Sequence, residues 1–342
     1  MRHAVRLRKR LQAPLDGAAM LDKGPIRTPP GAQLIACPPK QQIGHRLKGQ
    51  SMLLMGEIAQ GRRHHDLAIT LYNPAQHRAL AMRFGQDARV SILCFRSLAL
   101  WLLGYPGAAL ADAQHALNDA REIGHAATLM YALFFASFTY MFCGNYAAAN
   151  ALVDELVAMA EDKGALYWKA LGTVLQSHVT ALTGRASSVL ESITAGINAW
   201  RSTGSTIWMP LFLSFAAKAF SEAGNFEDAW RCIAEAMPTM ETTKERWCEA
   251  EVNRMAGEIM LKSPERDAAK AAAYFERALV VARTQQAKSW ELRAAVSMAR
   301  LWRDQGKRDA ARDLLAPVYG WFTEGFDTLD LKEAKALLDE LG

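Results

Sequence analysis

The sequence predicts an all-α protein built as a helical repeat array, and three observations lead to this prediction. Glycines recur every forty residues at Gly104, Gly144, Gly184 and Gly224. A second glycine series lies about half a period after the first: Gly124, Gly164 and Gly204. Apolar residues make up 51% of the chain, with abundant alanine and few prolines after residue 50, a composition that suits packed helices. Two turns per period indicate two helices per period.

The period continues toward the C-terminus with one irregularity. Gly306 lies two periods and two residues after Gly224, and the extra residues fit a longer turn near Ser263 and Pro264. A chain of 342 residues could hold two ordinary domains, but a fixed period predicts one array whose core grows with each repeat. We therefore expect a right-handed αα-superhelix with a repeat of about forty residues and about six and a half helix pairs.

Residues 1–50 differ from the rest of the chain. They hold six of the twelve prolines, ten Lys or Arg and only two Asp or Glu, and they show no sustained apolar period. We expect a disordered basic leader here, and a repeat domain from residue 51 to residue 342. An amphipathic or targeting role for the first ten residues is the alternative.

The repeat domain is expected to begin with a short helix pair and to end with a capping helix. The first pair covers residues 51–72, is broken at Gly61 and ends before Pro74. Asp330 and Glu333 fit a capping box that opens a last helix to Leu341. Six pairs are expected between them: 88–103 with 107–122, 127–142 with 146–162, 166–182 with 186–202, 206–222 with 226–241, 246–261 with 265–284, and 289–304 with 308–322.

Charge and hydropathy argue against nucleic acid and membrane partners. The net charge of +5 arises in the leader, because the remaining residues hold 30 Lys or Arg against 33 Asp or Glu. A clustered basic face on the folded part, which nucleic acid binding needs, is not expected. Residues 126–153 contain no charged residue and could suggest a membrane span. The repeat turn at Gly144 falls inside this run, so we favour a buried central helix pair.

The sequence shows no catalytic or metal-binding motif. We find no phosphate-binding glycine loop, no zinc-ligand spacing and no nucleophile elbow. The five cysteines form no C-x-x-C pair, and we expect them to be small buried apolar residues. His64 and His65 are adjacent on a helix and point in different directions, so we do not expect a metal site there. We expect a cytoplasmic, non-enzymatic protein without cofactor.

Two groups of residues are candidates for binding a partner. Trp168, Trp208, Trp247 and Trp290 begin successive first helices, spaced by 40, 39 and 43 residues. We favour packing between repeats for these rings, with a ligand-stacking strip as the alternative. Glu251, Arg254 and Glu258 form a charged stripe on the helix after Trp247, on the helix type that lines the concave side of such arrays. The candidate groove residues are Trp208, Trp247, Glu251, Arg254 and Glu258.

The repeats resemble the tetratricopeptide pattern. Gly104 and Tyr105 after two leucines, followed by alanines early in the next helix, match its order of residues. The usual tetratricopeptide period is 34 residues, so a period of forty implies longer helices. The expected structural turn residues are Gly104, Gly144, Gly184, Gly224 and Gly306.

Several segments resemble a bacterial multidomain family. These are residues 287–295 (AKSWELRAA), 299–306 (ARLWRDQG), 314–327 (LLAPVYGWFTEGFD), 72–78 (YNPAQHR), 83–87 (RFGQD) and 99–106 (ALWLLGYP). Members join a class III adenylate or guanylate cyclase domain, or a transcriptional-regulator domain, to a predicted signalling ATPase and a long tetratricopeptide-like array. This chain lacks the cyclase aspartates and the ATPase phosphate loop, so neither activity carries over to any residue here.

The resemblance implies a regulatory module in bacterial signal transduction that binds a protein or peptide partner. It also suggests a shortened relative of the multidomain proteins. Two alternatives remain open from the sequence. The concave groove could sense a peptide or a small-molecule effector and regulate a partner, or the chain could work as part of a nucleotide cyclase system.

Overall fold

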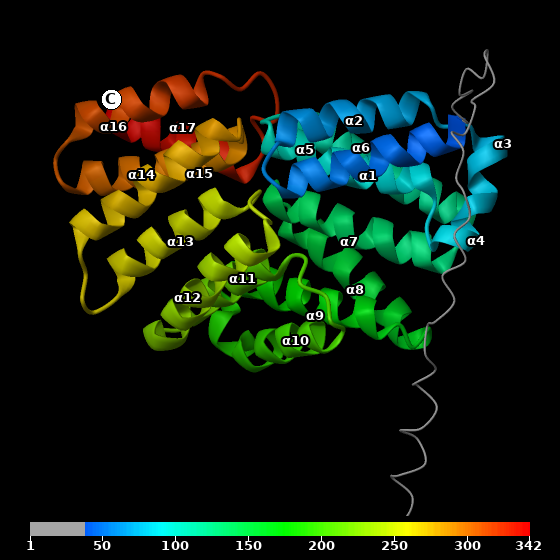
Figure 1. Ribbon diagram of the computed structural model, residues 1–342. Helices are drawn as coiled ribbons and strands as arrows, with labels where there is room; N and C mark the ends of the chain where they lie inside the picture. Colours follow the sequence, from blue (N-terminus) through cyan, green and yellow to red (C-terminus); the bar gives the residue numbers. More distant parts are fainter. Residues whose placement is uncertain (1–37) are drawn as a thin grey trace, which may run out of the picture. The chain divides into compact units, whose positions relative to one another are not determined.

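The computed structural model describes residues 38–342, and every regular element in this part of the chain is helical (Figure 1). The prediction of an all-α repeat protein is confirmed. The disordered leader was expected over residues 1–50, and residues 1–37 of that segment lie outside the described part.

Seven helix pairs and a final helix follow one another in order along residues 38–342. Three short helical segments connect the first pair to the second: α3 (Pro74–His77), η1 (Arg78–Leu80) and α4 (Ala81–Phe84). The last helix is α17 (Leu329–Leu341). The pairs are α1 (Pro38–Leu54) with α2 (Ile58–Thr70), α5 (Ala88–Leu102) with α6 (Pro106–Ile123), α7 (Ala126–Phe142) with α8 (Tyr146–Asp162), α9 (Leu166–Thr180) with α10 (Leu190–Ser202), α11 (Met209–Glu222) with α12 (Phe226–Thr243), α13 (Glu249–Lys262) with α14 (Ala268–Thr284), and α15 (Lys288–Asp304) with α16 (Arg308–Tyr319).

The first pair differs from the prediction. Helix α1 begins at Pro38, so residues 38–50 are helical rather than disordered, and the turn of the pair lies at Gly56 rather than Gly61. Two prolines can open a helix because its first residues need no N–H partner. Gly61 lies inside α2, where a Cβ atom would come 2.8 Å from the Gly49 carbonyl oxygen of α1. These two glycines allow the helices to cross closely.

The glycine period marks the turns as predicted. Gly104, Gly144, Gly184, Gly224 and Gly306 all have φ between +77° and +86°, the left-handed conformation that glycine adopts without a Cβ penalty. At this position in the third repeat, the chain leaves the helical conformation at Thr183 and Gly184, and a 3₁₀ segment at Ala186–Val189 leads into α10.

The first and second helices of a pair have different environments. Helix α7 is buried on almost every side, whereas α8 buries a single stripe at Ala149, Val153, Leu156 and Ala160. The first helices therefore form an inner layer and the second helices an outer one. The uncharged run 126–153 is explained by this burial. Within residues 38–342 no helix combines the length and the apolar character needed to cross a membrane.

The array returns to its own beginning, which the sequence did not predict. The C-terminal ends of α1, α5 and α7 meet the N-terminal ends of α13, α15 and α17. The Leu54 carbonyl accepts the Arg246 N–H at 2.7 Å, the Ser289 hydroxyl donates to the Trp101 carbonyl, and the Leu329 N–H approaches the Cys143 carbonyl at 3.4 Å. We call this set of end-to-end contacts the seam.

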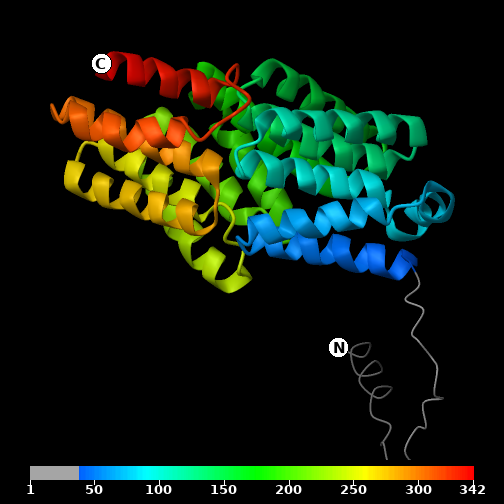
Figure 2. The same ribbon diagram turned by 90° about the horizontal axis from the view of Figure 1, so that it is seen from above.

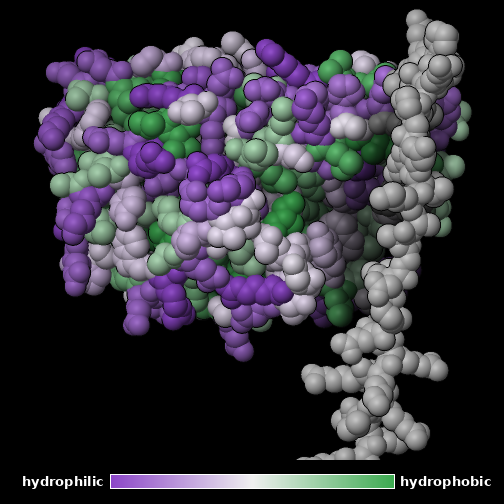
Figure 3. All heavy atoms as spheres, in the orientation of Figure 1, coloured by the Kyte–Doolittle hydropathy of each residue, from purple (hydrophilic) through white to green (hydrophobic). Residues whose placement is uncertain are grey.

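Figures 1 and 2 show the seam as the place where the orange and red C-terminal helices meet the blue and cyan N-terminal helices. Apart from the seam, each pair packs mainly on the next, as in other solenoids. On the face in Figure 3, hydrophilic residues dominate and hydrophobic residues occur in separate patches, because most apolar side chains belong to the core.

Candidate functional site

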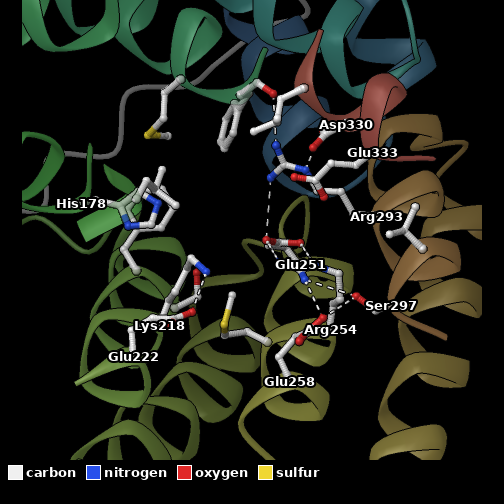
Figure 4. A pocket seen from close by; sticks show the side chains of 18 of the residues that line it. His178, Lys218, Glu222, Glu251, Arg254, Glu258, Arg293, Ser297, Asp330 and Glu333 are labelled. Carbon is white, nitrogen blue, oxygen red and sulfur yellow. Dashed lines mark hydrogen bonds and ion pairs between the residues drawn. The ribbon is translucent and has the colours of Figure 1, made fainter. Parts of the chain in front are cut away.

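The inner helices enclose a groove on the concave side, with a cavity of about 310 Å³. Its walls come from α7, α9, α11, α13, α15 and α17, so the site needs at least five consecutive first helices. Figure 4 shows the charged side chains converging on the groove, with His178 on the opposite wall. The charged residues that line it are Lys218, Glu222, Glu251, Arg254, Glu258, Lys262, Arg293, Arg300, Asp330 and Glu333.

Arg254 organises the centre of the groove. Its guanidinium donates two hydrogen bonds to the Glu251 carboxylate, each 2.7 Å long, and a third at 3.3 Å to Glu258. Ser297 from α15 donates to the same Glu258 oxygen at 2.6 Å. Burial acts to raise the pKa of Glu251, but the adjacent Arg254 and Arg293 outweigh it and lower the pKa below its usual value. Both carboxylate and guanidinium therefore stay charged in the groove.

Arg293 connects the groove to the seam. Its Nε donates to Asp330 of α17 at 2.8 Å, and a terminal nitrogen donates to the Phe142 carbonyl of α7 at 3.1 Å. The guanidinium also lies over the rings of Trp101 and Trp290, 5.1 and 5.2 Å from their centroids. One side chain thus holds three helices of the inner layer by charge, hydrogen bonds and cation–π contact.

The rim of the groove is made of more exposed ion pairs. Lys262 contacts Glu222 at 2.6 Å, and Lys218 contacts the same carboxylate at 3.3 Å. Arg300 contacts Glu333 at 2.8 Å, with both side chains more than 40% exposed. Such exposed pairs contribute little to stability, so they can exchange for contacts to a partner at small cost.

His178 supplies an uncharged polar surface on the opposite wall. Its ring stacks on Phe215 with centroids 3.6 Å apart and planes within 7°. Burial lowers its pKa well below the usual value, so the ring is neutral at pH 7. Its Nδ1 has no hydrogen-bond partner among residues 38–342. Met141, Phe142 and Leu182 line the groove near it and add apolar surface.

Three of the five candidate groove residues lie in the groove and two do not, and the binding role of the three stays a prediction. Glu251, Arg254 and Glu258 line the cavity together. Trp208 and Trp247 are only 3% and 0% exposed, and their rings pack edge to face with centroids 5.6 Å apart in the core. They cannot contact a ligand in the groove, so the packing interpretation of these two tryptophans is correct and the ligand-stacking interpretation is wrong.

The predicted capping box is also wrong. Thr328 is the N-cap of α17, and Asp330 and Glu333 turn toward Arg293 and Arg300 of α15 instead of capping the helix. Each of the two carboxylates forms a charge-assisted pair with an arginine, at 2.8 Å in both cases. Sequence analysis missed Arg293, Lys218 and His178. For Arg293 the available signal was a set of arginines on α15 followed by a set of carboxylates on α17, whereas Lys218 and His178 carried no such signal.

Within residues 38–342 there is no group of three or more His, Cys, Asp or Glu side chains that could hold a metal ion. The four described cysteines, at positions 94, 143, 232 and 248, are buried thiols, as expected for apolar packing. Burial raises the pKa of Cys143 to about 12, so this thiol is not reactive at neutral pH.

Comparison with known proteins gives the fold. No family model and no curated protein matches the sequence. Among solved structures, the apo form of RapI matches with a TM-score of 0.54 and 10% identity, over 88% of this chain and 99% of that one. Aspartyl phosphate phosphatase F from Bacillus subtilis matches with 0.54 and 9%, over 86% and 72%. A Rap protein complexed with competence and sporulation factor matches with 0.51 and 11%, over 88% and 96%. The shared fold is a tetratricopeptide-like αα-superhelix.

Proposed function

We propose that this chain is a non-enzymatic regulatory module that binds a protein or peptide segment in its concave groove. The observation that carries the proposal is the preformed cavity, in which charged side chains from three first helices and the final helix α17 converge opposite an apolar wall. Grooves between packed helices, lined by apolar surface and a few fixed polar groups, are typical binding sites.

The charge balance of the groove favours a peptide over nucleic acid. Five cations and five carboxylates line it, so it has no excess positive charge to neutralise phosphates. A peptide segment offers both charges and an apolar side chain. Its carboxylates match Lys262 and Arg300, its cations match Glu222 and Glu333, and an apolar side chain fits beside His178 and Phe215.

The likeness to a Rap protein complexed with competence and sporulation factor is consistent with ligand binding by this fold. The sequence segments that resemble bacterial cyclase and regulator proteins support a role in signal transduction, and the chain would act there as a regulatory part without the catalytic domains. A small-molecule effector in the same groove is the alternative occupant.

A capture experiment with groove variants tests the proposal. Two baits are compared in native extract: the wild-type full chain and a double variant that carries K262E and R300E. The bound proteins and peptides are quantified by mass spectrometry. Both positions are exposed, so the variant should fold normally. K244E, with 65% of its side chain exposed and outside the groove, is the matched control.

We expect one or a few partners that the wild type and K244E capture equally. The groove variant should capture at least about tenfold less of these partners, which corresponds to a loss of about 1.4 kcal/mol of binding free energy. Equal capture by all three baits would place the interaction outside the groove and overturn the proposal. A partner peptide identified this way should also raise the melting temperature of the purified chain.

A further inference from the structure

A second cavity lies at the seam, away from the groove, with a volume of about 510 Å³. Its walls come from α2, from the turn between α5 and α6, from the end of α14, from the start of α15 and from the segment after α16. It therefore exists only because the array returns to its own beginning. The residues that line it are Ala59, Arg62, Arg63, Asp66, Leu103, Tyr105, Arg283, Gln286, Lys288 and Trp321.

The seam cavity differs from the groove in charge. Four cations line it, Arg62, Arg63, Arg283 and Lys288, against the single carboxylate of Asp66. Asp66 is already shared, because it contacts Arg96 at 3.2 Å and Arg62 at 3.6 Å. The charges of this cavity are therefore unbalanced, whereas those of the groove are matched one to one.

The partners outside the cavity do not restore the balance. Arg283 and Lys288 both contact Glu291, at 2.9 and 2.7 Å, so two cations share one carboxylate. Arg63 is exposed and forms no ion pair with any residue of 38–342. The excess of positive charge makes the cavity attractive to an anion, and the planar arginine groups match the geometry of phosphate oxygens.

Two aromatic rings lie among these cations. Tyr105 and Trp321 pack edge to face with centroids 5.6 Å apart, and Trp321 remains 36% exposed. Arg62 lies over the Tyr105 ring at 5.4 Å and Lys288 over the Trp321 ring at 5.5 Å. A tryptophan left partly exposed in a cavity that is lined by four cations is suited to stack on a flat ring, because stacking needs only an accessible aromatic face.

We propose that the seam cavity binds a small phosphate-bearing ligand with a flat ring, the chemical class of a mononucleotide. The arginines and Lys288 contact the phosphate, and Trp321 stacks on the ring. The volume falls within the range of about 300 to 1,000 Å³ that is usual for small-ligand sites. The ligand bridges the first two pairs and the last two pairs, so its binding strengthens the seam. It can regulate the groove because the groove residue Arg293 bonds to the Phe142 carbonyl at another point of the seam.

The test is isothermal titration calorimetry of the purified full chain with adenosine monophosphate and guanosine monophosphate, and with adenosine and inorganic phosphate separately. R63A removes an exposed, unpaired arginine and should not disturb folding. R185A removes another exposed arginine that forms no ion pair within residues 38–342 and lines neither cavity, so it is the matched control. K262E, in the groove, separates this site from the proposed peptide site.

We expect a nucleotide to bind with a stoichiometry of one, and adenosine and phosphate each to bind at least about tenfold more weakly. R63A should lower the affinity by about tenfold, the effect of losing one charge-assisted contact, while R185A and K262E leave it unchanged. Replacing Trp321 by leucine should also weaken the nucleotide more than phosphate. Phosphate binding as tightly as the nucleotides, no binding of either nucleotide at millimolar concentration, or equal affinity in R63A would overturn the proposal.

Discussion

Gly144 and Gly224 hold the same position in the repeat and have almost the same backbone, with φ of +79° and +80°, but their surroundings differ. A Cβ atom on Gly144 would lie 2.3 Å from Leu329 Cβ of the last helix, whereas one on Gly224 would have nothing within 4 Å. Gly104 and Gly184 repeat the contrast, with Trp321 at 2.5 Å from the first and open space around the second. The turns at Gly104 and Gly144, the seam turns, therefore also pack against another part of the chain, whereas the open turns at Gly184 and Gly224 do not.

The comparison shows that a sequence period can specify a local conformation without specifying its tertiary partner. Positive φ favours glycine at all four turns for the same reason. Only at the seam does the missing side chain also make room for another part of the chain. The backbone strain and the steric clash can be measured separately. Alanine should cause both at Gly104 and Gly144, but only the backbone strain at Gly184 and Gly224.

The largest expected difference is between alanine at Gly144 and alanine at Gly224. At Gly224 only the left-handed backbone is strained, so G224A should lower the free energy of unfolding by about 1 kcal/mol. At Gly144 the new methyl group must also displace Leu329, which brings the loss to about 3 kcal/mol. Urea denaturation followed by circular dichroism measures both values. Equal losses in the two variants would mean that α17 does not rest on this turn.

Removing the arginine that holds the seam should have the next largest effect. R293A leaves the Asp330 and Glu251 carboxylates without one of their cations and removes the bond to the Phe142 carbonyl. We expect a loss of about 2 kcal/mol, lower than for fully buried pairs because the side chains keep some solvent contact. R300A, which breaks the exposed pair with Glu333, should cost less than about 0.5 kcal/mol. Similar melting temperatures for the two variants would contradict this assignment.

The seam should also respond to pH through Glu245, which precedes the Arg246 N–H bonded to α1. This carboxyl is buried and accepts hydrogen bonds from the Trp208 N–H and the Trp247 Nε1–H. Burial raises its pKa to about 7, while the two bonds oppose the shift. A carboxyl whose folded pKa is raised stabilises the fold below its unfolded pKa of about 4.5 and loses that contribution as pH rises through 7.

Replacing this residue by glutamine keeps an acceptor and removes the titration. Between pH 5 and pH 8, wild type should lose about 2 kcal/mol of unfolding free energy relative to E245Q. Thermal and urea unfolding of both proteins at the two pH values measure the difference. E245D is not a suitable control because it shortens the side chain. G224A, which lies in an open turn and keeps Glu245, is used instead, and its unfolding free energy should change with pH as that of wild type does.

The smallest expected effect concerns a single seam hydrogen bond. The Ser289 hydroxyl donates to the Trp101 carbonyl of α5, 188 residues earlier in the chain. S289A should cost about 1 kcal/mol, because the carbonyl keeps its bond from the Gly104 N–H. Ser137, whose hydroxyl bonds only to carbonyls of its own helix, is the control, and S137A should cost clearly less. If S289A lost no more unfolding free energy than S137A, the seam bond would not stabilise the fold.

Much of the fold could be predicted because turns and helix faces are local properties. The glycine series placed the turns, and the apolar stripes placed thirteen of the helices to within a few residues. Helix α1 was not predicted because its buried face has few apolar side chains, with Gln42, Arg46 and Gly49 before Leu53. A search for apolar periodicity cannot detect such a helix. The seam contacts could not be predicted because they join residues far apart in the sequence, which no local pattern relates.

The candidate site could be predicted only where one helix carried it. Glu251, Arg254 and Glu258 stand on one face of α13, so their spacing was enough. Arg293, Asp330 and His178 reach the groove from other helices, and their convergence depends on the curvature of the superhelix. Trp208 and Trp247 recur with the period as binding residues might, but large aromatic rings at repeat junctions are also what a continuous core requires.

The seam also restricts how this chain can evolve. Open solenoids tolerate gain or loss of whole repeats, because each unit contacts only its neighbours. Here α1, α5 and α7 meet α13, α15 and α17, each five pairs further along the chain. Duplication of one forty-residue unit between them would move every one of these contacts out of register at once. The contacts therefore fix the spacing of five pairs between the helices that meet at the seam, although the period itself sets no such spacing.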